Sequence, residues 1–195
     1  LSNGDIDVSA SKSGVGVYSN GAVTSGNGST ITIGEDGTGV YIKDASLDLD
    51  NLELNLSGDN SVGIYTDGTA AFTGSGIVNL DGKGITVFNI AGSGGINQNF
   101  TVNSTAGSQY TMQNLNNTTF YYNSTANMGE GGAFLTGANS AIFLDEDSSI
   151  TSTADNMTGI ALKGSYAGGL PVTINGEVQY YDVVNKGQIS FGNNS

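Results

Sequence analysis

The densest group of acidic side chains lies in the segment LDEDSS, residues 144–149. Asp145, Glu146 and Asp147 are consecutive there, and hard cations such as Ca²⁺ are bound by several carboxylate and carbonyl oxygens. The segment has neither the ligand spacing of an EF-hand loop nor its central glycine. We therefore expect a solvated acidic turn without a metal ion, and we keep its three acidic residues as candidates for contact with a partner.

A second group of carboxylates, Asp48 and Asp50, alternates with Leu47 and Leu49. Paired carboxylates hydrolyse glycosides when they face one another across a substrate. In an extended strand, the same alternation places the acids on one face and the leucines on the other, so an outward acidic face is the expected arrangement. The chain has no histidine, arginine or cysteine, which excludes His-activated nucleophiles and thiolate metal sites. We predict no enzyme activity, no catalytic residue and no cofactor, with a carbohydrate-active enzyme as the alternative.

One aromatic cluster stands out in the segment TTFYYN, residues 118–123. Exposed tyrosines suit contacts with sugars or proteins, whereas buried ones pack a core. Buried packing is the more frequent arrangement for such a cluster, and contact with a partner is the alternative. Tyr121 and Tyr122 therefore join the acidic turn as candidate binding residues.

The net charge of the chain is −13, from 18 acidic residues against five lysines. A chain of this charge is repelled by phosphate backbones and by anionic membrane surfaces, so neither nucleic acid nor lipid is an expected partner. No apolar run approaches the length of about 18 residues that a membrane-spanning helix needs. We predict no membrane insertion of this segment, and we expect a monomer.

A short pattern of small, apolar, polar and turn residues recurs along the chain, most clearly as VGVYSNG, TGVYIKD and VGIYTDG. Its aromatic position falls at Tyr18, Tyr41, Tyr65 and Phe88, in steps of 23, 24 and 23 residues. The same position continues at Tyr110, Phe134 and Ala161. A period of this length, with two short strands per repeat, is typical of a solenoid.

Local patterns add strands and corners to this period. Segments such as STITIG and NFTVN alternate like β-strands, and SNG, GNG and TDG supply turn residues. The alternation in LDLDNLELNL changes parity once, near Asn51, which indicates a bend or bulge. We assign the aromatic column to the core, with a ligand platform as the alternative. Columns of Asn or Thr are expected to form hydrogen bonds between coils.

These observations predict one all-β unit over residues 1–195, a parallel β-helix of about eight coils of roughly 23 residues each. The repeat is longer between about residues 134 and 160, so we place loop excursions near 139–149 and 165–171. The chain is interpreted as a fragment of a longer one.

The repeats VGVYSNGA, TGVYIKDA and VGIYTDGTA, separated by Gly- and Asn-rich strands, resemble those of bacterial type V autotransporter adhesins, notably the fusobacterial type. The resemblance covers most of the chain, is clearest over 13–92 and 130–165, and carries no catalytic signature. It implies a right-handed parallel β-helix, the passenger region, displayed outside the cell and anchored in the outer membrane through a separate C-terminal barrel. No binding residue is carried over from the family.

Taken together, the sequence predicts a rigid extracellular stalk that acts in adhesion to host cells or other bacteria. The expected partner is a surface protein or glycan of the host or of another bacterium. The alternatives are a passive spacer and a polysaccharide hydrolase or lyase built on the same fold.

Overall fold

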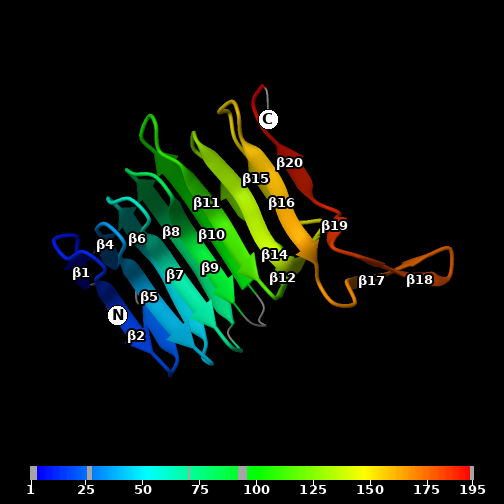
Figure 1. Ribbon diagram of the computed structural model, residues 1–195, viewed down its shortest axis with the longest axis horizontal. Coiled ribbons are helices and arrows are strands. Elements are labelled where there is room, and N and C mark those ends of the chain that lie inside the picture. Colours follow the sequence, from blue (N-terminus) through cyan, green and yellow to red (C-terminus); the bar gives the residue numbers. More distant parts are fainter. Residues whose placement is uncertain (1–3, 26–27, 70, 92–95, 194–195) are drawn as a thin grey trace.

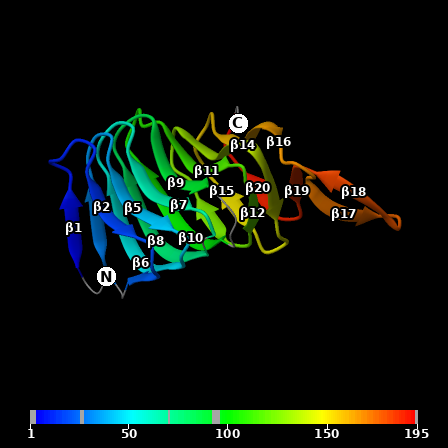
Figure 2. The ribbon, with the colours of Figure 1, turned by 60° about the horizontal axis from the view of Figure 1, so that its bottom comes forward.

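The computed structural model describes residues 4–25, 28–69, 71–91 and 96–193. These residues form strands and turns without a helix. The strands stack in parallel as a β-solenoid of about six turns, with equivalent positions about 24 residues apart (Figures 1 and 2). The predicted architecture and period are confirmed, whereas the number of turns is smaller than the eight predicted.

The strands are β1 (Asp5–Val8), β2 (Val15–Ser19), β3 (Val23–Ser25), β4 (Thr30–Ile33), β5 (Thr38–Lys43), β6 (Leu47–Leu56), β7 (Val62–Asp67), β8 (Phe72–Leu80), β9 (Ile85–Ala91), β10 (Ile96–Ser104), β11 (Tyr110–Asn116), β12 (Thr119–Tyr122), β13 (Thr125–Asn127), β14 (Gly132–Leu144), β15 (Ser149–Thr151), β16 (Thr158–Ser165), β17 (Leu170–Ile174), β18 (Glu177–Tyr181), β19 (Val183–Asn185) and β20 (Gln188–Ser190). Two nine-stranded sheets form the walls of the coil. Sheet A has the order β1-β4-β6-β8-β10-β13-β15-β20, with β3 beside β6. Sheet B has the order β2-β5-β7-β9-β11-β14-β12, with β16 and β19 also paired to β14.

Equivalent side chains of successive turns stack on one another inside the coil. In sheet A, Leu54 pairs in register with Ile31 on one side and Val78 on the other, and all three are fully buried. Burying one such side chain contributes about 1.5–3 kcal/mol. Each turn therefore depends on its neighbours for a continuous core, as expected for a solenoid.

Each turn bends at residues whose backbone is left-handed. Asp36, Asn60 and Gly84 follow one another along one corner, with φ of 55°, 57° and 69°. Asn60 also donates a hydrogen bond through Nδ2 to Asp36 Oδ1 at 3.2 Å. Asn117 and Asn139, each with φ 49°, follow one another at another corner. Gly, Asn and Asp reach this conformation at least cost, which explains why the sequence is rich in them.

The bend predicted within LDLDNLELNL is present. Asn51 has φ 52°, and the register of β6 against β8 shifts between Leu49 and Leu52. Leu49 and Leu52 are both buried, so the extra residue of this bulge restores the inward face of the strand.

Substitution of Asn117 tests the role of these corners. Asn117→Ala is expected to lower the free energy of unfolding by about 1 kcal/mol, because an alanine at positive φ brings its Cβ too close to the backbone. Asn117→Gly is expected to leave stability the same or slightly higher. Chemical denaturation of both variants measures the difference. Equal losses in the two would show that the side chain, not the backbone conformation, matters here.

Polar columns on the outside tie the turns together, as predicted for Asn and Thr. On sheet A, Asn79 donates to Asn55 Oδ1 at 2.8 Å, and Asn103 donates to Asn79 Oδ1 at 3.0 Å. On sheet B, Asn114 donates to Asn89 Oδ1 at 2.9 Å, and Thr136 donates to Asn114 Oδ1 at 3.1 Å. These ladders stabilise the stacking of neighbouring turns on both walls.

Within the residues that the structure describes, the chain leaves the coil in the hairpin of β17 and β18. These antiparallel strands pair only with each other and project beyond the stacked turns (Figure 2). Because of the hairpin, Ser149 pairs with Gln188, far beyond the usual step of one turn. The hairpin therefore takes up residues that the prediction had counted as additional turns.

The two predicted excursions differ in the structure. Residues 165–171 lead from β16 into the hairpin. Residues 139–144 instead continue β14 and pair with β12, and residues 145–148 form a tight turn closed by a hydrogen bond from Ser148 N to Asp145 O at 2.9 Å. The excursion expected near 139–149 is therefore part of the wall, because its apolar residues alternate as a strand.

No helix in the described residues is long and apolar enough to cross a membrane.

Candidate functional site

Tyr121 and Tyr122, adjacent in β12, face opposite sides of the wall. Tyr121 is 50% exposed, and its ring centroid lies 5.7 Å from that of Phe143 on the outside. Lys186 Nζ lies 5.4 Å from the centroid of the Phe143 ring, within cation–π range. Tyr121 is thus placed where a partner can reach it.

Tyr122 is buried, contrary to its selection as a binding residue. Its ring packs between Phe120 and Phe134, with centroid distances of 5.8 and 5.3 Å. Burial raises the pKa of the Tyr122 hydroxyl, so the group stays neutral inside the core. The alternation of side chains along a strand explains why only one of the two adjacent tyrosines is accessible.

The predicted acidic turn lies at the surface. Glu146 and Asp147 are exposed, and Asp145 is half-buried with its Oδ1 accepting the backbone N–H of Glu146 at 2.7 Å. Among the described residues, no group of three or more His, Cys, Asp or Glu side chains is arranged to hold a metal ion. The carboxylates of Glu146 and Asp147 point into solvent and do not converge on a common point.

Asp48 and Asp50 also face outward, while Leu47 and Leu49 are buried. Asp48 Oδ1 accepts a hydrogen bond from Thr73 at 2.8 Å, and Asp50 Oδ1 accepts one from Ser75 at 2.5 Å. Each carboxylate is therefore tied to the next turn of the coil, which is the expected arrangement of an outward acidic face. Asp48 and Asp50 lie side by side on the same face, so they do not face one another across a space for a substrate.

The most conspicuous exposed feature is a row of three tyrosines on the outer face of sheet B. Tyr18, Tyr41 and Tyr65 are in register on β2, β5 and β7. Their rings stack with centroid distances of 5.2 and 4.9 Å and interplanar angles of 17° and 9°. Tyr18 is 63% exposed and the other two are half-buried. We call these three residues the tyrosine row.

A neighbouring carboxylate anchors Tyr41, the central residue of the tyrosine row. The Tyr41 hydroxyl donates a hydrogen bond to Asp67 Oδ2 at 3.2 Å, and Lys43 Nζ lies 4.0 Å from the same carboxylate oxygen. Desolvation is the main cause that raises the pKa of Tyr41, and the hydrogen bond to Asp67 raises it further. The hydroxyl is therefore protonated at neutral pH and donates to the carboxylate. The stacked rings and the Tyr41 hydroxyl are thus ordered before any partner arrives.

The sequence assigned this aromatic column to the core, and the structure corrects the assignment in two ways. Tyr65 is followed in its column by Asn89, not by Phe88, which pairs with Ile64. β5, β7 and β9 each place two successive residues inward, so Phe88 continues the buried column of Val40 and Ile64, and Asn89 continues the column of the tyrosines. The polar tip of tyrosine and its position between inward-facing apolar residues were the signals for an outer column.

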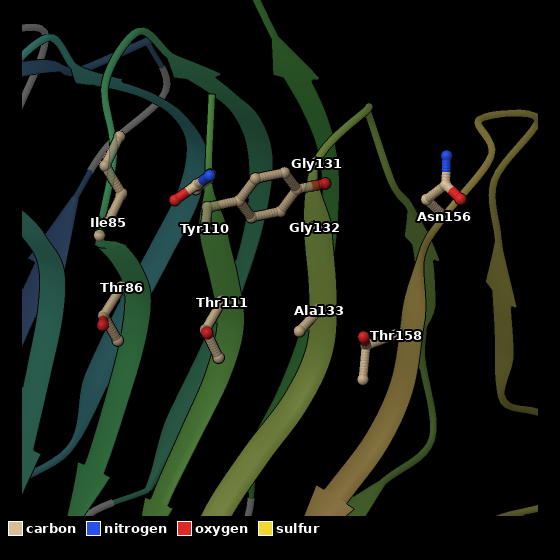
Figure 3. A pocket seen from close by; sticks show the side chains of 11 residues that line it. Ile85, Thr86, Tyr110, Thr111, Gly131, Gly132, Ala133, Asn156 and Thr158 are labelled. Carbon is tan, nitrogen blue, oxygen red and sulfur yellow. The ribbon is translucent and has the colours of Figure 1, made fainter. Parts of the chain in front are cut away.

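A shallow groove lies farther along the outer face of sheet B. It is formed at the beginning of strands β9, β11, β14 and β16, next to the turns that precede them. Thr86, Thr111, Ala133 and Thr158 lie side by side across it, and the Tyr110 ring extends beside them (Figure 3). The cavity measures about 440 Å³. This lies within the range of small-ligand sites, about 300–1,000 Å³.

In comparisons with known proteins, no family, no curated protein and no solved structure matches this chain. Its function is therefore argued from the fold, the tyrosine row and the groove.

Proposed function

We propose that this chain is an extracellular β-solenoid module that acts in adhesion, as a stiff segment of a bacterial surface protein. The observation that carries the proposal is the tyrosine row, an ordered and exposed aromatic surface on a rigid wall. Tyrosine is enriched among the residues that dominate binding energy at protein interfaces. Its ring supplies a large contact area with little loss of conformational freedom.

The architecture supports this role. Solenoids present extended lateral surfaces, and equivalent side chains repeat at the spacing of neighbouring strands, about 4.8 Å. The internal columns and the external Asn ladders restrain neighbouring turns against one another. A partner therefore meets a surface that does not have to be ordered on binding, which reduces the entropic cost of adhesion.

The proposed partner is a surface protein or glycan on a host cell or another bacterium. The net charge of −13 disfavours nucleic acids and anionic lipids by simple repulsion. The resemblance of the repeats to autotransporter passengers supports a location outside the cell, anchored to the outer membrane by another part of a longer protein.

Replacing the tyrosine row tests the proposal directly. The triple variant Tyr18→Ser, Tyr41→Ser and Tyr65→Ser is expected to reduce binding of the immobilised chain to cells by about tenfold or more, because the contact surface loses its aromatic rings. Adhesion is measured with host epithelial cells and with partner bacteria. Circular dichroism shows whether the coil remains folded.

A matched control uses exposed tyrosines elsewhere. Tyr180 is 64% exposed on the hairpin, close to the value for Tyr18, and Tyr181 is its exposed neighbour. The double variant Tyr180→Ser and Tyr181→Ser is expected to bind cells like the original chain. If the original chain binds no cells at all, the passive spacer is the better description, and polysaccharide turnover would favour the enzyme.

A further inference from the structure

The groove on sheet B has no charged side chain in its lining, although the chain carries 18 acidic and five basic residues. Its polar groups are the side chains of Thr86, Thr111, Thr158, Gln109 and Asn156. A cationic or anionic ligand would find no side chain of opposite charge in the groove, and the net charge of −13 would repel an anionic one. The lining therefore suits a neutral ligand rich in hydroxyl groups.

The polar side chains of the groove are also free to bind. Within the described part of the chain, the hydroxyls of Thr86, Thr111 and Thr158 and the amide of Asn156 have no hydrogen-bond partner. On the same wall, by contrast, Thr136 donates its hydroxyl proton to the neighbouring turn. Polar side chains beside the groove thus form hydrogen bonds with the neighbouring turn, whereas the threonines that line the groove do not.

Small residues on β14 and just before it create the depth of the groove. Ala133 stands in register between Thr111 and Thr158, so the row of side chains dips at this strand. A Cβ atom on Gly132 would lie 2.4 Å from Tyr110 Cζ, which shows that the glycine makes room for the ring. The Tyr110 hydroxyl donates to Gly129 O at 2.8 Å, and this bond fixes the ring as part of the wall.

The direction of the groove indicates the shape of its ligand. Thr86, Thr111 and Ala133 are in register on β9, β11 and β14, so the groove runs along the coil axis across successive strands. Threonine occupies three of the four positions in this row, on strands about 4.8 Å apart, and Ala133 occupies the fourth. A linear polymer of similar units can repeat its contacts from strand to strand, whereas a compact ligand uses only one step.

An extended peptide fits this site less well. The backbones of β9, β11 and β14 are already paired on both sides, and only β16 at the end of the groove, which pairs with β14 alone, leaves an edge for an added strand. A peptide added there would lie beside β16 and not over Thr86, Thr111 and Ala133. Hydroxyl groups that both donate and accept match the threonines and amides instead.

We propose that this groove binds a segment of a neutral oligosaccharide, laid along the coil axis over Thr86, Thr111, Ala133 and Thr158. The proposal deepens the adhesive function described above and rests on it, because it names a glycan as one partner of this β-solenoid. The site is separate from the tyrosine row, which lies on β2, β5 and β7.

Titration with defined glycans tests the groove without using cells. The probes are neutral oligosaccharides of dextran, mannan, galactan and β-glucan, with hyaluronan and oligogalacturonate as acidic probes. At least one neutral probe is expected to bind, with binding that strengthens with chain length, and the acidic probes are expected not to bind. Binding of acidic probes alone, or of none of the neutral ones, would overturn the proposal.

Two groove variants locate the binding. Thr111→Val keeps the shape of the side chain and removes its hydroxyl, so affinity is expected to fall about three- to tenfold. Ala133→Leu fills the dip in the row and is expected to abolish binding. Thr32→Val, at a half-buried threonine on sheet A, serves as the matched control and is expected to change nothing. Unchanged affinity in both groove variants would place the glycan elsewhere and contradict the proposal.

The two proposals fail in different ways. If a neutral glycan binds the groove while cells do not adhere, the adhesive function is wrong and the groove remains a binding site. If cells adhere and the Ala133→Leu variant adheres equally, while no neutral glycan binds, the groove proposal is wrong and the adhesive function remains.

Discussion

Replacing Phe88 by alanine is expected to lower the free energy of unfolding by about 3–5 kcal/mol. Phe88 lies on β9 in the middle of the coil and is fully buried. Its ring is 5.3 Å from the ring of Phe72 and 5.3 Å from that of Phe100, both on the opposite sheet. The substitution removes both aromatic contacts and leaves a cavity that the rigid walls cannot close.

The position of Phe88 increases the consequence. In a solenoid, each turn is stabilised by its own contacts and by the interfaces with the turns on either side. Phe88 contacts rings from the strands that precede and follow it in the chain, so the cavity weakens the interfaces on both sides. We expect the folded segments before and after β9 to lose part of their coupling along with the overall stability.

Denaturation by urea, followed by circular dichroism, measures the effect. Ile77→Ala is the control, because Ile77 is 46% exposed on the outside of β8 and its truncation is expected to cost less than about 0.5 kcal/mol. Phe88→Leu retains most of the buried volume and is expected to fall between the two. A loss below about 1 kcal/mol for Phe88→Ala would show that the aromatic stack is not a principal source of stability.

The sequence contains enough information for the architecture because the architecture is repetitive. The recurring apolar positions predict stacked parallel strands, and the change of parity at Asn51 predicts a real bend. Asn55, Asn79 and Asn103 form the kind of ladder that a repeated polar column requires. In each case the same local pattern recurs in several repeats, so the interpretation of one repeat is supported by its neighbours.

The features that the sequence did not place correctly depend on small changes of register. The residue in register with Tyr65 is Asn89, and Phe88 belongs to the adjacent buried column of Ile64. Spacing alone does not separate two adjacent columns, and it assigned the tyrosines to the core. Tyr122 could not be distinguished from Tyr121 for the same reason, because the face of a short strand depends on where its register begins.

The groove depends on contacts between turns that no single repeat reveals. It exists because Gly132 and Ala133 occupy positions at which the neighbouring turn carries Tyr110 and Thr111. Each of these residues is ordinary within its own repeat. Only their alignment across the sheet leaves a depression, so the sequence analysis of individual motifs had no signal for it.

Gly76→Ala is expected to destabilise the chain by about 4 kcal/mol, an effect comparable to that of Phe88→Ala. Gly76 has φ 149°, and an added Cβ would lie 1.9 Å from Leu52 O and 2.8 Å from Leu52 N. The unfavourable backbone conformation costs about 1–3 kcal/mol, and the overpacking costs about as much again. Because the obstructing atoms belong to the backbone of β6, no side-chain rotation can relieve the contact.

The surrounding structure explains why Gly76 cannot adapt. Gly76 pairs with Leu52 where β6 carries its extra residue, and Ser75 Oγ accepts the backbone N–H of Asn51 at 3.3 Å. Moving β8 away would break this contact and shift the buried leucines of β6. Gly107→Ala is the matched control, because Gly107 has φ 88° and nothing within 4 Å of the added Cβ, so only the backbone cost of about 1–2 kcal/mol is expected. Equal losses of stability in the two variants would show that the bulge can open, and that the close approach of β8 to β6 is not what fixes the bend.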